Sequence, residues 1–134
     1  MVSFKKLKKI NVIGGDVLHA LKKSDTNFKK FGEAYFSIVL PNVIKGWKLH
    51  TKMTCNLVVP IGNIKFVATK DITKFNVFEI GESNYGMLTI PPNYWFAFKC
   101  VSKTKSIILN ISDFEHDPCE SIKKDINEIK FNWS

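Results

Sequence analysis

Short runs of β-branched and aromatic residues, separated by turn residues, recur along most of the chain. Runs of this kind at intervals of about 8–12 residues are typical of a β-sandwich or a jelly-roll barrel. A pair such as Gly62-Asn63, between two apolar runs, also predicts a tight hairpin. The pattern predicts strands at 9–13, 35–40, 44–50, 54–60, 64–69, 74–81, 86–90, 94–101 and 105–112.

Two segments depart from the strand pattern. Residues 16–25 carry apolar side chains at helical spacing, but the segment is short and lies between strand signals, so we interpret it as a strand. Residues 117–133 begin with Asp117-Pro118, a favourable helix start, and contain charged pairs at helical spacing. The sequence therefore predicts an all-β fold with a short C-terminal helical segment of one or two turns, followed by an extended tail.

The chain has 134 residues, of which 45% are hydrophobic, and it contains no repeat or low-complexity linker. These features predict one globular domain over residues 1–134. No apolar run approaches the roughly 20 residues of a membrane span, and the basic N-terminus lacks the apolar region of a secretory signal. Cys55, Cys100 and Cys119 are widely spaced and form no C-x-x-C pair, which favours reduced thiols in a cytoplasmic protein.

The net charge of +8 comes entirely from lysine, because the sequence contains no arginine. Proteins that recognise nucleic acids usually rely on the planar guanidinium for bidentate contacts, which lysine cannot reproduce. We therefore expect no nucleic-acid partner. A small anionic ligand such as a nucleotide diphosphate remains compatible with lysine, and so does a plain role of the lysines in solubility.

The central stretch, residues 35–68, holds ionisable side chains inside an otherwise apolar run. Side chains alternate along a strand, so Lys48, His50 and, across a break, Lys52 are expected on one face. Trp47 and Leu49 are expected on the other face. Ionisable groups that face a β-rich core are costly unless they are solvated, paired or used in function.

Several motifs of the chain resemble one enzyme family. They are KGWKLH at 45–50, LVV at 57–59 with Gly62, IPPNYWF at 90–96, and NISDF at 110–114 with Asp117-Pro118 beyond. Together they resemble the cupin sugar-nucleotide enzymes, namely the dTDP-4-dehydrorhamnose 3,5-epimerases and the dTDP-4-keto-6-deoxyhexose 3,4-ketoisomerases. The resemblance covers most of the chain. It implies a cupin jelly-roll barrel that pairs as a homodimer.

The family's catalytic motif aligns with residues of the central stretch. Without gaps, Tyr35 takes the place of the ketoisomerase tyrosine, and Lys45 that of the arginine. Lys48 then falls on the first histidine of that motif and His50 on the second. The basic histidine of the epimerases falls on Lys48 in the same register, or on His50 if two residues are inserted.

Three further family positions hold other residues in this chain. Phe96 stands where the epimerases have a second histidine, Leu109 where they have the acid tyrosine, and Asn56 where a lysine opens their Lys-Leu-Val strand. The match on Asn56 makes it a candidate substrate-binding residue.

The resemblance implies an epimerase or isomerase of a nucleotide-linked 4-keto-6-deoxy sugar in surface-polysaccharide biosynthesis. Such enzymes move a proton at a carbon next to a ketone, which requires a base and a group that stabilises the enolate oxygen. His50 is the candidate base, because its ordinary pKa is near neutrality. Lys48 is a candidate second base or electrophile, and Tyr35 a candidate proton donor.

Other residues are candidates for binding the substrate. Lys45 and Lys52 are candidates for holding the diphosphate, and Trp47, Tyr94 and Trp95 for stacking on the sugar or the base. Each also has a purely structural interpretation, such as a lysine reaching to the barrel mouth or an aromatic side chain in the core or a dimer interface. His19 and His116 lie in polar segments and are expected to be exposed.

Metal-dependent cupins are an alternative class. They need two histidines one residue apart, a glutamate and a later histidine, but Lys48 precedes His50 and the next glutamate is Glu79. We therefore expect proton transfer without a metal or another cofactor. Two other hypotheses remain open: a non-catalytic sugar or sugar-nucleotide binding protein, and a structural partner in a biosynthetic complex.

Overall fold

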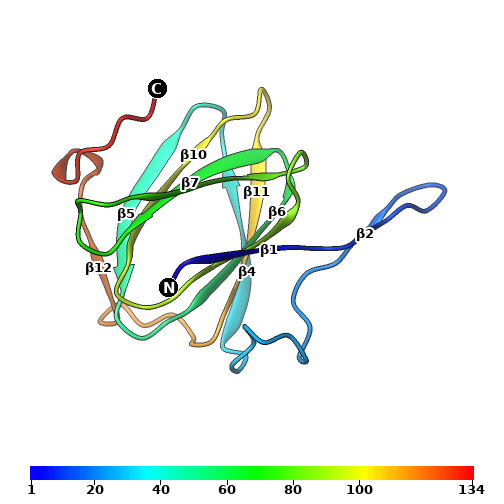
Figure 1. The fold of residues 1–134 in the computed structure, drawn as a ribbon, viewed down its shortest axis with the longest axis horizontal. Coiled ribbons are helices and arrows are strands. Elements are labelled where there is room, and N and C mark those ends of the chain that lie inside the picture. Colours follow the sequence, from blue (N-terminus) through cyan, green and yellow to red (C-terminus); the bar gives the residue numbers. More distant parts are fainter.

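The computed structural model describes residues 1–134 and shows two five-stranded antiparallel sheets that face each other (Figure 1). One, called the β4 sheet here, has the order β1-β9-β6-β11-β4, and the other, the β5 sheet, has the order β12-β5-β10-β7-β8. The strands are β1 (Ser3–Lys6), β2 (Lys9–Ile10), β3 (Val17–Leu18), β4 (Glu33–Val39), β5 (Ile44–His50), β6 (Cys55–Ile61), β7 (Asn63–Thr69), β8 (Asn76–Gly81), β9 (Gly86–Ile90), β10 (Trp95–Cys100), β11 (Ser106–Ser112) and β12 (Ser121–Lys123).

The predicted all-β fold is confirmed, and β4 to β11 each lie within two residues of a predicted strand. The prediction was less accurate near the N-terminus. Of residues 9–13 and 16–25, only Lys9–Ile10 and Val17–Leu18 are in strands, and these pair with each other in a two-stranded ladder. The hairpin that carries them projects from the body of the molecule (Figure 1).

Between β4 and β12 every connection except β7–β8 passes from one sheet to the other, as in a jelly roll. The predicted hairpin at Gly62-Asn63 is therefore wrong, because β6 and β7 belong to different sheets. Gly62 instead forms a corner, with a φ of +82° that favours glycine. Its N–H donates to the Glu82 carboxylate, and a side chain here would collide with Ser106.

Alternate side chains of the facing strands fill the space between the two sheets. Ile64, Phe66 and Ala68 of β7 meet Leu57 and Val59 of β6 in one continuous apolar core. All five are at most 4% exposed. This alternation is what the period-two pattern of the sequence predicts.

The predicted C-terminal helical segment is wrong in its main part. Residues 117–120 form a turn, Ser121–Lys123 form β12 against β5, and only Ile126–Glu128 form a single 3-10 turn. The reason is tertiary packing, since Ile129, Phe131 and Trp133 cover the outer face of the β5 sheet around the buried Trp47. The structure contains no helix with the length and apolar character needed to cross a membrane.

Candidate active site

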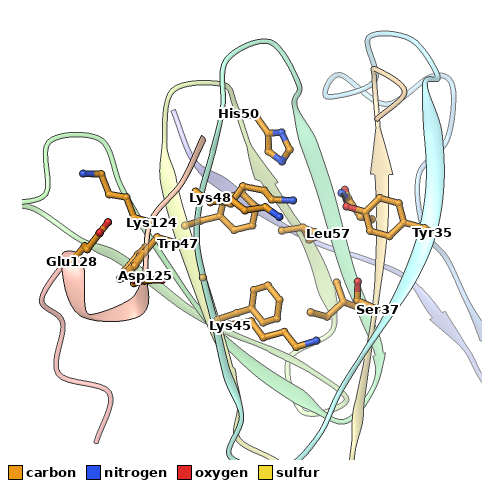
Figure 2. Close-up of a pocket in the computed structure, with 16 residues that line it drawn as sticks. Tyr35, Ser37, Lys45, Trp47, Lys48, His50, Leu57, Lys124, Asp125 and Glu128 are labelled. Atoms are coloured by element: carbon orange, nitrogen blue, oxygen red, sulfur yellow. Dashed lines mark hydrogen bonds between the residues drawn. The ribbon is translucent and has the colours of Figure 1, made fainter. Parts of the chain in front are cut away.

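A cavity of about 690 Å³ opens between the two sheets, and the three candidate catalytic residues, Tyr35, Lys48 and His50, all line it (Figure 2). The β4 sheet supplies one wall, with Tyr35, Ser37 and Asn110. The β5 sheet supplies the facing wall, and the C-terminal segment forms the rim. The facing wall and the rim include Lys45, Lys48, His50, Phe96, Phe98, Lys123, Lys124, Asp125 and Glu128.

A bulge in β5 decides which side chains reach the cavity. Phe96 of β10 is opposite Lys48 and the next residue, Ala97, is opposite Gly46, so Trp47 has no partner on β10. Strict alternation would put Lys45 and Lys48 on opposite faces, but the extra residue brings both to the cavity side. Gly46 permits the bulge with a φ of +151°, and a Cβ there would lie 2.2 Å from that of Ala97.

His50 ends β5 at the top of the cavity in Figure 2 and is 7% exposed. Its Nδ1 lies 2.7 Å from Oε1 of Glu120, which is 6% exposed. The other carboxylate oxygen accepts the backbone N–H groups of Lys52 and Met53, at 2.9 and 2.8 Å. Since Glu120 is an acceptor, Nδ1 carries the proton, and the free Nε2 is left to accept one.

The surroundings of Glu120 set its protonation state. Burial opposes its ionisation, but the hydrogen bonds from His50 and from the backbone of Met53 and Lys52 outweigh burial. The pKa of Glu120 therefore lies below its ordinary value. The carboxylate therefore stays charged and accepts the hydrogen bond from Nδ1 of the imidazole.

Tyr35 lies on the opposite wall, on β4, and is labelled across the cavity from Lys48 in Figure 2. Its hydroxyl oxygen accepts a hydrogen bond from Nδ2 of Asn110 at 3.0 Å. Burial raises the pKa of Tyr35, and the Asn110 hydrogen bond acts against that rise. The hydroxyl is therefore protonated at neutral pH and able to donate a proton.

The cavity lining carries more positive than negative charge, with four lysines (Lys45, Lys48, Lys123 and Lys124) and two carboxylates on the rim (Asp125 and Glu128). The chain has only two ion pairs, Lys5–Asp25 and His50–Glu120, so Lys45, Lys48 and Lys123 are unpaired. Lys123 lies opposite Lys48 on the neighbouring strand β12. Closely spaced ammonium groups without carboxylate partners favour an anionic ligand.

The other candidate residues either lie away from the cavity or make contacts within the protein. Trp47 is among the residues that line the cavity, but its indole packs against Phe75 and Trp133 and donates to the carbonyl of Ile126. Four of the predicted substrate-binding residues do not line the cavity: Lys52, Asn56, Tyr94 and Trp95.

Each of these four has a different environment. Asn56 accepts hydrogen bonds from Asn27 and Thr89 on the outer face of the β4 sheet. Trp95 packs with the C-terminal segment, and Tyr94 packs against the central core. The Lys52 side chain is exposed, and only its backbone N–H takes part, through Glu120.

The family positions that hold other residues also have distinct places. Phe96 lines the cavity and stacks on the His50 ring, with centroids 6.1 Å apart. Leu109, matched to the acid tyrosine, faces outward and packs against Val58 and its neighbours. Its neighbour Asn110 faces the cavity instead.

Sequence analysis did not predict that Asn110, Glu120, Lys123 and Lys124 belong to this site. Glu120 is 70 positions from His50, and no local spacing connects them. A buried histidine at neutral pH does, however, call for a hydrogen-bond partner, and this requirement is the one signal in the sequence that pointed to such a residue. No group of three or more His, Cys, Asp or Glu side chains is placed to hold a metal ion.

Comparisons with known proteins also give sugar-nucleotide enzymes. No protein-family model matches the chain. It is 34% identical to a crystal structure of a dTDP sugar isomerase from Desulfovibrio desulfuricans G20, with a TM-score of 0.93 over 98% of this chain and 90% of that one. The 3,4-ketoisomerase QdtA from Thermoanaerobacterium thermosaccharolyticum, in complex with TDP, shares the fold at 20% identity, with a TM-score of 0.78 over 96% and 93% of the two chains.

Two curated proteins are similar at the level of sequence. A probable low-salt glycan biosynthesis epimerase, Agl13 of Haloferax volcanii, is 27% identical over 75% of this chain and 72% of its own length. The spore coat polysaccharide biosynthesis protein SpsL of Bacillus subtilis (strain 168) is 25% identical over 99% of this chain and 95% of its own.

Proposed function

Because the chain belongs to the dTDP-sugar isomerase family, we propose that it is an epimerase or isomerase of a nucleotide-linked 4-keto-6-deoxy sugar in polysaccharide biosynthesis. One observation carries the proposal. A histidine fixed by a buried carboxylate faces a tyrosine hydroxyl across a cavity lined with unpaired lysines. This arrangement suits proton transfer next to a ketone.

The proposed chemistry uses only side chains of this chain. Nε2 of His50 removes the proton from the carbon next to the C4 ketone, and Glu120 stabilises the imidazolium. The Lys48 ammonium stabilises the negative charge that develops on the enolate oxygen. Tyr35 then gives its hydroxyl proton to the enolate carbon, and solvent restores both groups.

The positions of base and acid bear on the outcome of the reaction. His50 belongs to the β5 sheet and Tyr35 to the β4 sheet, so a sugar ring held between the walls has one group on each side. Removal of a proton on one face and its return on the other inverts the carbon. We therefore favour epimerisation over migration of the keto group.

We assign the diphosphate to the lysines at the mouth of the cavity. Lys45 and Lys123 have no carboxylate partner, and Lys124 also reaches the rim. Lysine interacts with phosphate as a point charge, so a chain without arginine can still hold a diphosphate there. The substrate partner is accordingly a nucleotide-diphosphate sugar.

We also infer that two copies of the chain associate. The outer face of edge strand β4 exposes Phe36 and Ile38, Leu40 is exposed just beyond the end of the strand, and the adjacent outer face of β11 is apolar too. The N-terminal segment packs on the neighbouring part of the same sheet, in a cluster that includes Leu109 of β11 but none of the three exposed side chains of the β4 edge. Such an uncharged face on an edge strand suits a self-complementary homodimer interface.

A cytoplasmic location fits this proposal. The three cysteines form no disulfide, and Cys55 and Cys100 are buried as free thiols. Free thiols of this kind are typical of a reducing compartment.

The decisive experiment incubates the protein with dTDP-4-keto-6-deoxyglucose in heavy water and follows the sugar protons by NMR. We expect deuterium at the carbon next to the ketone together with an inverted product. His50→Asn is expected to remove both while the protein stays folded. Binding of the substrate without any exchange would instead indicate a non-catalytic sugar-nucleotide binding protein.

Binding is tested separately by thermal unfolding in the presence of dTDP, GDP, UDP or CDP. A ligand that prefers the folded state raises the melting temperature. We expect the largest rise with dTDP. Equal shifts for all four would contradict recognition of the base.

A further inference from the structure

Asn110 lies in the wall of the active-site cavity and is 4% exposed. On β11 it is opposite Tyr35 of β4 and Leu57 of β6, both of which also line the cavity. Paired residues of neighbouring strands place their side chains on the same face. The ladder therefore holds the Asn110 amide beside the Tyr35 hydroxyl.

The contact between the two side chains has a defined direction. Nδ2 of Asn110 donates to the Tyr35 hydroxyl oxygen at 3.0 Å and also approaches the Cys55 sulfur at 3.7 Å. The Tyr35 hydroxyl thus acts as an acceptor toward the protein. Its own O–H has no acceptor among the protein groups, and it is left for a ligand in the cavity.

This orientation of the Asn110 amide leaves its oxygen atom without a hydrogen bond. Oδ1 of Asn110 is buried and has no hydrogen-bond partner. Unpaired buried oxygens are rare, because they lose the hydrogen bonds that water would give. With the amide reversed, Oδ1 would accept the Tyr35 O–H and hold its proton away from the cavity.

We propose that Asn110 is a positioning residue that keeps the Tyr35 proton directed at the substrate, an inference that rests on the proposed function. The N–H of the amide fixes the phenol oxygen, and the same hydrogen bond stabilises the tyrosinate that forms when Tyr35 gives up its proton. Asn110 itself moves no proton in this scheme.

The same hydrogen bond influences the ionisation of Tyr35. Burial raises the pKa of Tyr35, and the N–H of Asn110 counteracts that effect. Removal of the N–H is therefore expected to raise the pKa of Tyr35 further. The titratable groups around the hydroxyl are Glu33 on its own strand, Cys55 on β6, and Lys45, Lys48 and His50 on the facing β5.

The test compares proton exchange with product formation in heavy water. Asn110→Leu removes the donor but keeps the number and branching of the side-chain heavy atoms, and Asn110→Asp offers only an acceptor. Because His50 still removes the proton, we expect exchange to persist while product formation falls about 10–100-fold, so that their ratio rises about tenfold or more. Cys55→Ala, which removes the other contact of the amide, is the matched control and is expected to leave the ratio unchanged.

A second measurement does not depend on turnover. The absorbance of tyrosinate is followed with pH in the wild-type protein and in Asn110→Leu, each minus its Tyr35→Phe counterpart. We expect the Tyr35 midpoint to rise in Asn110→Leu. An unchanged midpoint, equal losses of exchange and product, or full activity of Asn110→Asp would overturn the inference.

The two experiments separate this inference from the proposed function. If the wild-type protein exchanges no substrate proton, the proposed function is wrong, and the role assigned to Asn110 in proton donation is wrong with it. If the wild-type protein exchanges normally and Asn110→Leu behaves like it, only the inference about Asn110 is wrong.

Discussion

His50 and Glu120 form a buried pair in which Nδ1 and Oε1 are 2.7 Å apart, although 70 positions separate the two residues in the sequence. Glu120 is held in place by the backbone N–H groups of Lys52 and Met53. A carboxylate anchored in this way fixes both the orientation and the tautomer of the imidazole. The orientation of the base therefore depends on Glu120, in the turn that precedes β12. No pattern in the sequence connects this turn with β5.

Glu120→Gln is expected to lower kcat by about 10²–10⁴-fold with little change in KM, because an amide no longer selects the tautomer that leaves Nε2 free. Steady-state kinetics measure both constants. Glu115→Gln is the matched control, since Glu115 is an exposed carboxylate of the same connection. Equal activities of the two variants would contradict the assigned role of Glu120.

The same pair predicts a pH dependence of stability. Glu120 has a folded-state pKa below its ordinary value of 4.5, so the unfolded chain binds more protons than the folded one at acidic pH. The stabilisation is fully present above pH 4.5 and is lost as pH falls through the lowered pKa of the folded state. Glu120→Gln lacks this contribution.

Urea unfolding measured from neutral to acidic pH tests whether the free energy of unfolding falls as the pH falls. The free energy of unfolding of the wild-type protein should fall more steeply below pH 4.5 than that of Glu120→Gln, by at most about 1.4 kcal/mol per pH unit for one proton. Parallel curves would show that Glu120 ionises alike in the folded and unfolded chains.

Lys45→Gln and Lys123→Gln are expected to weaken dTDP binding about tenfold each, because each removes one charged contact to the diphosphate. Calorimetry at two salt concentrations measures the effect, which should shrink at high salt. Lys103→Gln is the control, an exposed lysine in the β10–β11 loop away from the cavity. Identical affinities in all three variants would show that the diphosphate does not bind at Lys45 and Lys123.

Much of the fold was predictable because β4 to β11 follow the period-two pattern of a two-layer β structure. The corner at Gly62 was not predictable. A glycine turn between two apolar runs has the same sequence pattern whether the runs pair with each other or lie in two different sheets. The helix-like spacing of residues 117–133 was also misleading. Ile129 and Trp133 bury against the β5 sheet, and this packing outweighs local propensity.

The site was partly predictable from one strand. Lys48 and His50 are two positions apart and reach the cavity together, as alternation predicts. Lys45 reaches it only through the bulge at Gly46, and Asn110 and Lys123 come from distant strands brought alongside by the ladders. Long-range pairing of this kind leaves no local signature.

Gly46→Ala tests the bulge directly. A Cβ at position 46 would meet the Ala97 side chain at 2.2 Å and its Cα at 2.8 Å, at a φ that disfavours any side chain. We expect a loss of about 2–4 kcal/mol in the free energy of unfolding, measured in urea. Gly14→Ala is the control for backbone strain alone, since nothing lies within 4 Å of its Cβ. Equal losses would mean that the close contact with Ala97 relaxes without cost.

The exposed apolar face of β4 gives the last prediction. Ile38 is 55% exposed, in a row with Phe36 and Leu40, and a lysine at this position would place a charge inside the proposed homodimer interface. We expect the wild-type protein to have twice the monomer mass of 15.3 kDa in light scattering, and Ile38→Lys to have the monomer mass.

Val77→Lys is the matched control for this change. Val77 is 47% exposed on β8, the edge strand of the other sheet, so the same charge is introduced at similar exposure but away from the β4 face. It should remain dimeric. Dissociation of both variants would point to general destabilisation, and a monomeric wild-type protein would contradict the proposed homodimer. Both variants add one positive charge, and only Ile38→Lys places it on the β4 face. Dissociation of Ile38→Lys alone would therefore identify β4 as the surface on which two copies meet.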